Sequence, residues 1–354
     1  MKKSIIYLMA IAIAAVTLAG CGKNVSMTMT TEKENIEIII LGTGTMSIDW
    51  GDETSTTETL SDNEAVCNHS YASSSVHTVK ITGDNITGLG CDGNQLTALD
   101  VSKNTALTVL VCSENQLTTL DVSKNTALTL FKCSENQLTA LDVSKNTALT
   151  LLNCPNNQLT TLDVSKNTAL TGLYCSENQL AALDMSNNTV LTELRCHQNQ
   201  LTALDKSKNT ALTELWCLNN QLTALDVSRC TALTNLYCWN NQLTALDVSK
   251  NTSLTSLVCG ENQLTTLDVS KNTALIDLSC YKNQLTALDV SNNTALTNLG
   301  CHENQLTAAA LNVLFGTLHS NTVEGKKKMH IRNNPGTYYC NRSIAENKGW
   351  TVSE

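Results

Sequence analysis

The residues of this chain that are able to do chemistry are scattered rather than gathered into a motif. The histidines occur in no metal-ligand or nucleophile pattern; they are His69, His77, His197, His302, His319 and His330. Serines recur at a fixed interval from Ser102 onward, but no base recurs beside them. The sequence thus pairs no nucleophile with a base. We therefore predict that the protein is not an enzyme and needs no metal and no cofactor.

Aspartate recurs every 21 residues from Asp100 to Asp289. Stacked carboxylates repel one another, so this row needs a physical reason. Calcium binding is one alternative, although the spacing differs from that of the known calcium-binding repeat. A basic residue stands three positions later in most copies, as Lys103, Lys124, Lys145, Lys166, Lys208, Arg229, Lys250 and Lys271. We therefore favour a solvated face on which opposite charges compensate each other.

Cysteine follows the same interval. Eleven of the 15 cysteines form one column, namely Cys91, Cys112, Cys133, Cys154, Cys175, Cys196, Cys217, Cys238, Cys259, Cys280 and Cys301. So many cysteines in a secreted chain would ordinarily suggest disulfides. Side chains stacked in parallel point poorly for such bonds, and a straight row cannot surround a tetrahedral zinc ion. We expect small reduced core residues, and leave the state of Cys67, Cys230 and Cys340 open.

Both columns belong to a 21-residue repeat that occurs eleven times over 86–307, of which Leu107 to Ala127 is one copy. Counted from the first Leu, positions 1, 4, 6, 11, 14 and 16 are apolar almost throughout. The pairs 4 and 6, and 14 and 16, alternate with polar residues, which is typical of strands. The pattern predicts a stack of coils with two parallel strand ladders. Asparagines at positions 9 and 19 stand where the chain must turn, and their amides can satisfy backbone groups there.

The repeat resembles the leucine-rich repeat, L-x-x-L-x-[LC]-x-x-N-x-L, and more narrowly the 21-residue bacterial subtype often called IRREKO. This resemblance implies a β-rich solenoid, a right-handed coil whose exposed strand face binds ligands. One core position departs from the pattern, since Lys206 replaces Val at position 16. We expect a local defect there, with the lysine stem reaching out toward solvent.

The two ends of the chain lie outside the repeats. Residues 1–20 read as a signal peptide with a basic start and a short apolar run. The string Leu18-Ala19-Gly20-Cys21 resembles a lipobox, which implies lipidation of Cys21. The polar stretch 21–34 is expected to be a flexible tether.

A small β cap is expected over 35–85, because an open stack exposes apolar surface at its first coil. The string Asp49-Trp50-Gly51-Asp52, with His69, Tyr71 and Val76 to Ile81 downstream, resembles part of a PKD-type β domain. Glu53 stands where that domain has glycine. A C-terminal α/β cap is expected over 308–354, with a helix over 308–315, a strand over 329–332 and a second short helix over 340–347. The lysine run 326–328 is expected to be a solvated loop.

Variable positions within the repeats indicate where function lies. Strand alternation directs positions 5 and 7 toward one exposed face. Aromatic residues gather on this face in repeats five to ten, which is typical of a binding site. The predicted site residues are Tyr174, Arg195, His197, Trp216, Leu218, Tyr237, Trp239 and Tyr281.

The chain carries 32 acidic and 23 basic residues, a net charge of −9, which argues against nucleic acid or an anionic membrane surface as the main partner. We expect a lipid-anchored binding protein of the bacterial cell envelope, with the outer membrane favoured and the side it faces left open. Protein recognition or adhesion is the favoured role, with a host or extracellular-matrix protein as one possible partner. Carbohydrate binding on the same face, helped by Arg195, Asn219 and Asn240, and a structural surface spacer are the alternatives.

Overall fold

The computed structural model describes residues 25–354, apart from 62 and 323–325. The expected signal peptide over 1–20 and the expected lipidation site Cys21 lie outside the described residues. None of the helices within the described part of the chain is long and apolar enough to cross a membrane.

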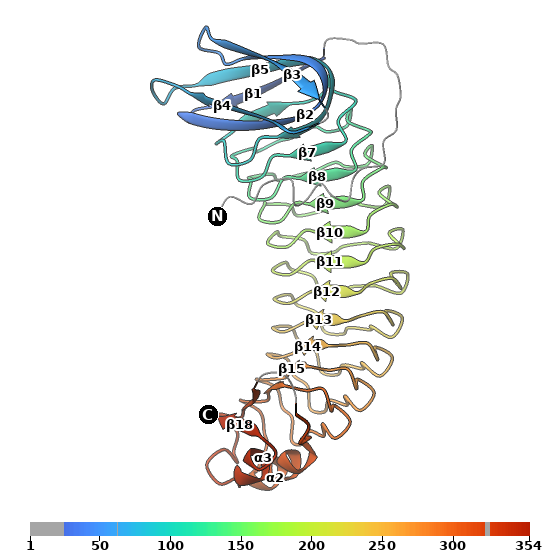
Figure 1. Ribbon diagram of the computed structural model, residues 1–354. Coiled ribbons are helices and arrows are strands. Elements are labelled where there is room, and N and C mark those ends of the chain that lie inside the picture. The colour runs from blue at the N-terminus through green and yellow to red at the C-terminus, as the bar shows by residue number, and fades with distance from the viewer. Residues whose placement is uncertain (1–24, 62, 323–325) are drawn as a thin grey trace. The chain divides into compact units, whose positions relative to one another are not determined.

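The chain divides into two compact units, 1–170 and 171–354. The N-terminal unit opens with an antiparallel sheet, visible in Figure 1, whose strands are β1 (Val25–Thr31), β2 (Asn35–Asp49), β3 (Ser55–Ser61), β4 (Ala65–Ser70) and β5 (His77–Gly90). The long strand β2 pairs with β3, β4 and β5, and β1 pairs with β5. Alternate residues of β1 and β2 are buried, as expected for strands with one face on a core.

The flexible tether predicted over 21–34 is wrong over 25–31, half of its length. Residues 25–31 form β1, and Met27 and Met29 on this strand are buried. The strand pairs with β5 along its full length and with β6 (Ala98–Asp100) in the first repeat. A polar, threonine-rich segment is still able to form a strand when neighbouring strands offer it partners, because threonine fits a half-buried sheet surface.

Strand β5 joins the sheet to the repeats. Strand β5 pairs antiparallel with β1 and with β2, and its last residues, Gly88–Gly90, pair in parallel with β7 (Val109–Val111) as well. The border expected between a cap ending at residue 85 and repeats beginning at 86 therefore lies inside one continuous strand.

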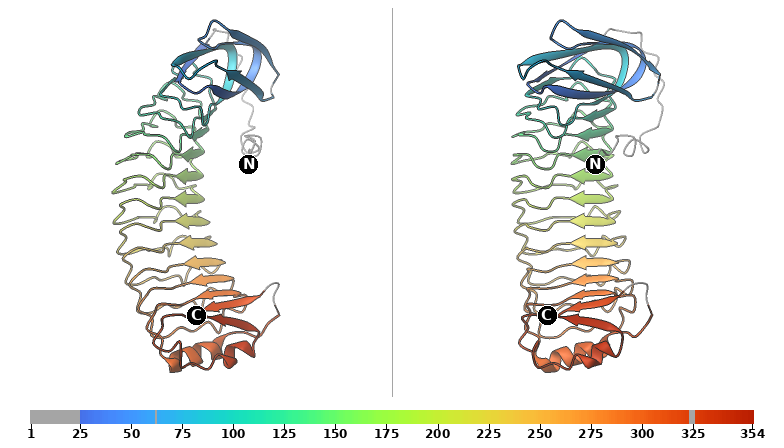
Figure 2. Two further views of the ribbon diagram at one scale, coloured as in Figure 1. Left: turned by 90° about the vertical axis from the view of Figure 1, so that its left-hand side faces the viewer. Right: turned by 60° about the vertical axis from the view of Figure 1, so that its left-hand side comes forward.

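Each repeat after the first contributes one strand of three residues, at positions 3 to 5. In the N-terminal unit these are β7, β8 (Leu130–Lys132) and β9 (Leu151–Asn153), paired in parallel and in register. In the C-terminal unit Figure 2 shows the corresponding ladder, formed by β10 (Gly172–Tyr174), β11 (Glu193–Arg195), β12 (Glu214–Trp216), β13 (Asn235–Tyr237), β14 (Ser256–Val258), β15 (Asp277–Ser279) and β16 (Asn298–Gly300). The β-rich leucine-rich-repeat solenoid predicted from the sequence is confirmed.

The second ladder, predicted at positions 14 to 16, is wrong. Within the described residues only β6 lies at these positions, and it pairs antiparallel with β1 rather than with the next repeat. The backbone N–H at position 17 donates to the aspartate at position 15 of the same repeat, as Ser102 does to Asp100 at 2.9 Å. This Asx turn bends the chain where an extended strand would be needed.

The same turn supplies the reason for the aspartate column. The hydrogen bond recurs in all ten copies, from Asp100 to Asp289. It lowers the pKa of most of these carboxyls; at Asp121 and Asp142 the Ser backbone N–H is the largest cause, ahead of the neighbouring lysine. Charge compensation by lysine is therefore the smaller effect.

The asparagines at position 9 satisfy backbone groups between repeats, as predicted. The amide nitrogen of Asn262 donates to the carbonyls of Cys238, Cys259 and Gly260 at 3.0–3.1 Å, and its oxygen accepts from the Leu243 N–H at 3.0 Å. The position-19 asparagines donate to two carbonyls of the preceding repeat in the same way. These side chains tie each repeat to its neighbour, while the apolar positions are buried.

All eleven column cysteines are free thiols and 0% exposed. Burial raises the pKa of the thiols of Cys154, Cys217 and Cys280 to about 12. Cys67 and Cys230 are also buried, and Cys340 is half-buried. The column acts as a packing element of the core, as predicted from its position in the repeat.

Position 8 has a left-handed backbone in every repeat, a feature that the repeat pattern did not reveal. Its φ values lie between 47° and 63°, with glycine only in the first copy, at Gly93. Glutamate stands there in several repeats, including Glu114, Glu135 and Glu177. A non-glycine residue is uncommon in this conformation, so position 8 carries local strain.

After the last repeat the C-terminal unit continues with helices that overlap the predicted ranges; the first strand there begins at 327 rather than 329, and the sequence did not predict the second strand. Helix α2 (Ala308–Thr317) begins at the N-cap Thr307, and α3 (Ser343–Glu346) follows later. Strands β17 (Lys327–His330) and β18 (Trp350–Ser353) extend the parallel ladder beyond β16.

The prediction of a solvated loop over 326–328 is wrong at Lys327. This side chain is 7% exposed, and its ammonium group donates to the carbonyls of Asn321 and Lys348 at 3.0 and 2.6 Å. Residue 327 begins β17, whose alternation turns its side chain toward the core. The buried charge is tolerated because backbone carbonyls surround it.

Candidate binding face

Four of the predicted site residues, those at position 5, lie on the exposed side of the short strands of the C-terminal unit, and the four at position 7 follow the strands. The side chains at positions 3 and 5 of each repeat point to this side. The Leu at position 4 points into the core and is 0% exposed in β10 to β16. Parallel pairing in register places position 5 of one repeat beside position 5 of the next, as with Arg195 and Trp216. The ladder therefore builds a continuous surface from residues 21 apart in the sequence.

A stack of planar groups runs across the first four strands of this unit. The guanidinium carbon of Arg195 lies 4.9 Å from the ring centroid of Tyr174 and 4.9 Å from that of Trp216. Trp216 packs on Tyr237 at 4.5 Å between centroids, and Tyr237 meets Trp239 edge-on at 6.3 Å. We call Tyr174, Arg195, Trp216, Tyr237 and Trp239 the aromatic face.

Two carboxylates line the edge of this stack at position 3. A nitrogen of the Arg195 guanidinium lies 3.6 Å from Glu214 and 3.9 Å from Glu193. The Tyr174 hydroxyl donates to Glu193, and burial together with this bond raises the pKa of the tyrosine. The amide of Asn235 donates to Glu214 at 3.4 Å. The face thus joins apolar rings, one cation and two carboxylates, each of which accepts one hydrogen bond.

Three nitrogen atoms in this cluster are buried and have no hydrogen-bond partner within the described residues. They are Arg195 Nε, Trp216 Nε1 and His197 Nδ1. His197 lies 6.1 Å from Trp216 between ring centroids, and burial lowers its pKa, so the imidazole is neutral at pH 7. Buried polar groups without partners are uncommon in folded proteins and ask for an explanation.

Two predicted site residues are placed differently from the others. Leu218 was expected on the exposed face but is 4% exposed, so it packs beneath the surface as a core residue. Tyr281 lies over Gly260, whose added Cβ would come within 2.4 Å of the tyrosine ring, and it stacks on His302 at 4.9 Å. Tyr281 and His302 form a second, smaller pair, separate from the contacts of the aromatic face.

The aromatic residues are half-buried rather than fully exposed, because they cover one another. Phe131 is fully buried, as its inward position predicts. The same face of the N-terminal unit is aliphatic, with Val109, Val111 and Leu130 in one cluster and Leu151 packed against it. Tyrosine and tryptophan on the strand face are therefore a property of the C-terminal unit.

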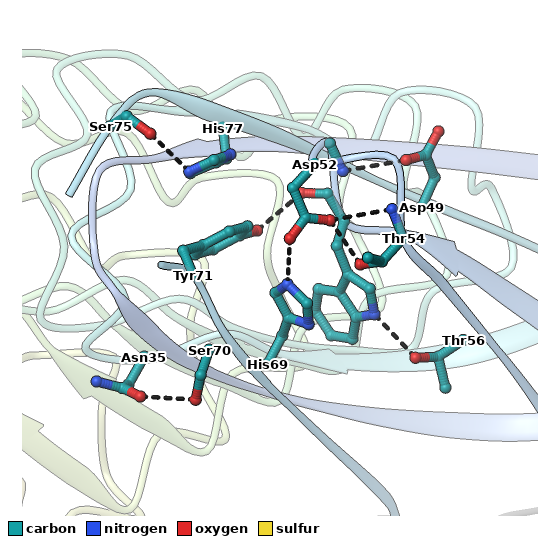
Figure 3. A network of polar contacts seen from close by, with 12 residues as sticks. Asn35, Asp49, Asp52, Thr54, Thr56, His69, Ser70, Tyr71, Ser75 and His77 are labelled. Atoms are coloured by element: carbon teal, nitrogen blue, oxygen red, sulfur yellow. Dashed lines mark hydrogen bonds and ion pairs between the residues drawn. The ribbon is translucent and has the colours of Figure 1, made fainter. Parts of the chain in front are cut away.

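A second polar cluster lies in the N-terminal sheet and is drawn in Figure 3. Asp52 contacts His69 at 2.8 Å, and His69 stacks on Trp50 at 4.7 Å. Tyr71 donates to the Trp50 carbonyl at 2.8 Å and stacks on His77 at 3.7 Å. Hydrogen bonds from Thr54 and His69 lower the pKa of Asp52 to about 2.

This cluster packs within the sheet, and its two large aromatic side chains are buried. Trp50 and Tyr71 are buried, and their polar atoms bond to Thr56 and to the backbone. Glu53, which stands beside them where the resembling domain has glycine, has a left-handed φ of 68°. Across the described ranges, no group of three or more His, Cys, Asp and Glu side chains is arranged to hold a metal ion.

Lys206 occupies the inward position 16, and it does not reach solvent. The residue is 2% exposed, and its ammonium group donates to the Leu204 carbonyl at 3.0 Å. One repeat later Cys230 replaces the usual asparagine at position 19, and its thiol donates to the Asn209 carbonyl at 3.5 Å. The prediction that the lysine stem extends outward is therefore wrong.

Solved structures share this fold. The chain is similar to the functional domain of InlJ from Listeria monocytogenes, which includes a cysteine ladder, with 37% identity and a TM-score of 0.66 over 76% of this chain and 61% of that one. It therefore spans less than two thirds of that protein. A leucine-rich repeat protein of Leptospira interrogans matches with 23% identity and a TM-score of 0.66, over 76% of this chain and 72% of the other. An internalin (inlF) of Listeria monocytogenes matches with 23% identity and a TM-score of 0.61, over 76% and 86%.

No protein-family model matches the chain, and no curated protein matches it. At 23% identity the Leptospira protein and inlF support the fold alone, whereas the InlJ domain shares sequence as well. The chain is thus a leucine-rich-repeat β-solenoid, and its structural neighbours are bacterial leucine-rich repeat proteins.

Proposed function

We propose that this chain is a non-enzymatic binding protein that recognises a protein partner through the aromatic face. The observation that carries the proposal is the continuous stack of Tyr174, Arg195, Trp216 and Tyr237 on adjacent strands. Tyrosine, tryptophan and arginine are the side chains that contribute most to protein interfaces. Here they stand on the one surface of the repeat that varies, while the core positions stay constant.

The stack also gives the face a fixed shape before any partner arrives. Each ring is held by its neighbour, and the strands beneath are tied by backbone bonds and by the position-9 asparagines. Binding therefore costs less conformational entropy at this surface than it would at a mobile loop, because the side chains of the surface are already ordered. This favours recognition of a partner that is itself folded or extended against the strands.

Carbohydrate binding remains the alternative outcome of the test below. Sugars stack on ring faces that point outward, whereas Trp216 and Tyr237 pack on each other at 4.5 Å with an interplanar angle of 46°. Rings in mutual contact leave less free face for a sugar, so a protein partner is favoured. The structural spacer is the third outcome, and the unpartnered nitrogens of the cluster argue against it.

We place the protein on a bacterial cell envelope, anchored by lipid on Cys21, as part of the same proposal; the outer membrane is favoured and the side it faces stays open. Its support is the sequence around that residue, Leu18-Ala19-Gly20-Cys21. Expression of the full chain in a bacterium, followed by mass spectrometry of the N-terminal peptide, tests this. We expect a peptide that begins at an acylated Cys21, and a Cys21→Ser chain that is released from membranes. An unmodified Cys21 in the mature protein would contradict the anchor.

The binding proposal is tested by screening the purified full chain against arrays of cell-surface and matrix proteins and of glycans. The variant Trp216→Ala/Tyr237→Ala/Trp239→Ala removes most of the face. Tyr338→Ala/Tyr339→Ala is the matched control, because these tyrosines are 76% and 82% exposed and belong to neither the stack nor the repeats. Circular dichroism checks that each variant keeps its fold.

We expect at least one protein to bind the native chain and the control with equal affinity, and to lose most of its affinity for the face variant. Glycan hits with the same dependence would replace protein by carbohydrate as the ligand class. Hits that survive the triple substitution would refute the aromatic face as the site. A screen without hits would favour the spacer.

A further inference from the structure

The guanidinium group of Arg195 is held in place but makes few directed bonds. Two rings sandwich it at 4.9 Å each, which fixes the plane of the group. None of its nitrogens donates a hydrogen bond within the described residues; its nearest acceptors are Glu214 at 3.6 Å and Glu193 at 3.9 Å. The side chain is 38% exposed, so the edge of the guanidinium group remains open to a partner.

The two glutamates beside it already have other donors. Glu193 accepts from the Tyr174 hydroxyl, and Glu214 accepts from the Asn235 amide at 3.4 Å. Each glutamate thus accepts one hydrogen bond, whereas the Arg195 guanidinium donates none within the described residues. Arginine carries five N–H groups in a rigid fork, and a planar acceptor with two oxygens matches that fork.

Three nitrogen atoms of the cluster bear on what a ligand is able to reach. Trp216 Nε1, which is always a donor, has no partner within the described residues, and neither has Arg195 Nε or His197 Nδ1. All three come from two adjacent strands, β11 and β12, or from the residues just after them. These three nitrogens are themselves buried, so the part of the cluster that a ligand is able to reach is the exposed end of the Arg195 guanidinium group.

We infer that Arg195 is the anchor of the aromatic face and that it binds a carboxylate from an acidic peptide segment of the partner. The inference rests on the proposed function and names the chemistry of its ligand. The carboxylate would lie in the plane of the guanidinium group, beyond the edge that Tyr174 and Trp216 leave open. The rings hold the arginine in position, and the acidic side chain selects the partner.

The glutamates limit how much negative charge this site accepts. One carboxylate pairs with one guanidinium, but a dense polyanion would face Glu193, Glu214 and a chain of net charge −9. We therefore expect a peptide with one or two acidic residues among uncharged or aromatic ones, rather than a nucleic acid or a sulfated polysaccharide. A basic peptide drawn to the glutamates is the opposite outcome.

The test selects binders from a phage-displayed library of random dodecapeptides with the native full chain. Synthetic versions of the enriched peptides are then measured, by fluorescence anisotropy, against Arg195→Gln, Arg195→Lys and Arg229→Gln. Arg229 stands at position 18, exposed and outside the strand face, so Arg229→Gln makes the same charge change elsewhere in the same unit. A Glu193→Gln variant reports on attraction by the face carboxylates.

We expect the enriched peptides to share an Asp or Glu whose replacement by Asn or Gln weakens binding tenfold or more. Arg195→Gln should cause a similar loss, and Arg195→Lys a loss of severalfold, because lysine keeps the charge but not the fork. Arg229→Gln should change affinity less than twofold, and Glu193→Gln should leave it equal or tighter.

Several outcomes would overturn the inference. These are a shared Lys or Arg in the peptides together with weaker binding to Glu193→Gln, equal effects of Arg195→Gln and Arg229→Gln, or no enriched peptide at all. In each case the proposed function is judged separately, because it stands or falls with the aromatic triple variant in the protein screen. If binding is lost in the triple variant but does not depend on Arg195, the aromatic face stands as the binding site and the proposal of a carboxylate ligand is refuted.

Discussion

Single residues that depart from the repeat are compared directly with the residues at the same position in the other repeats. Lys206 stands at a position that is otherwise Val or Met and is buried in the described copies. Its one hydrogen bond, to the Leu204 carbonyl, leaves the rest of the ammonium group without water. An amine buried with so few partners lowers stability relative to an apolar residue that fits the same space.

We predict that Lys206→Val raises the melting temperature, with a gain of about 1–2 kcal/mol in the free energy of unfolding. The control is Lys208→Val, two residues away on the exposed turn, which should change stability by less than about 0.5 kcal/mol. Thermal unfolding followed by circular dichroism gives both numbers. Equal or lower stability of Lys206→Val would mean that the amine is better satisfied than the structure indicates.

The left-handed residue at position 8 allows a second measurement at single residues. Glu135 has a φ of 53°, and asparagine stands at the same position in other repeats, as Asn156, Asn219 and Asn240. Asparagine tolerates this conformation better than glutamate, whereas a β-branched residue tolerates it poorly. We expect Glu135→Asn to stabilise by about 0.5 kcal/mol and Glu135→Val to destabilise by about 1–2 kcal/mol. Urea unfolding measures the pair, and a reversed order would mean that contacts of the side chain outweigh the backbone.

At the scale of elements, the buried asparagines connect one repeat to the next. Asn262 alone makes four hydrogen bonds to backbone groups, two in its own repeat, at Cys259 and Gly260, and two in the preceding repeat, at Cys238 and Leu243. Its removal would leave those groups buried and unpaired. Such a loss costs more than the removal of an exposed hydrogen bond.

We predict that Asn262→Ala destabilises the protein by about 2–4 kcal/mol. Asn292→Ala is the matched control, since Asn292 is exposed and makes a single bond to the Ser270 carbonyl at 3.2 Å; it should cost less than about 1 kcal/mol. Equilibrium unfolding in urea reports both. Equal costs would contradict the bridging role of the asparagine.

At the scale of the whole molecule, the aspartate column couples stability to acid. The pKa is lowered in eight of its members, namely Asp100, Asp121, Asp142, Asp163, Asp205, Asp226, Asp247 and Asp268. A carboxyl with a lowered pKa in the folded state stabilises the fold fully above its ordinary pKa of 3.8 and loses this contribution as the pH falls. Burial raises the pKa of Asp92 to about 6 and also raises that of Asp277, so these two act in the opposite direction.

We therefore expect the melting temperature to fall as the pH is lowered below about 4. In the variant Asp142→Asn/Asp163→Asn/Asp247→Asn/Asp268→Asn the amide oxygen still accepts the turn hydrogen bond but does not titrate. Its melting temperature should depend less on pH over the same range. An unchanged slope would show that the column does not govern acid stability.

The cysteine column predicts a uniform lack of reactivity. Its thiols are fully buried, burial raises the pKa of members such as Cys154 and Cys217, and thiolate is the reactive form. Under native conditions we expect a maleimide to label Cys340 among the described cysteines, and the column only on unfolding. Peptide mapping by mass spectrometry locates the label, and Cys340→Ser is the control. Labelling of the column at the rate of Cys340 would contradict a closed core.

The sequence by itself determined the repeat: its register, its inward leucines, the buried cysteines, the turn asparagines and the strand face on which the aromatic residues lie. These follow from side-chain type at a fixed interval, since each repeat meets its neighbours in the same way. Alternation of apolar residues shows which side of the chain is buried but not whether its backbone pairs with another strand. For this reason the prediction of a second ladder was wrong where an Asx turn bends the chain. Only the tertiary structure decided that β1 joins β5 and β6, that Lys206 stays inside, that Leu218 is covered, and that Arg195 lies between two rings. Each of these depends on a partner supplied by another segment, and the local pattern does not contain that partner.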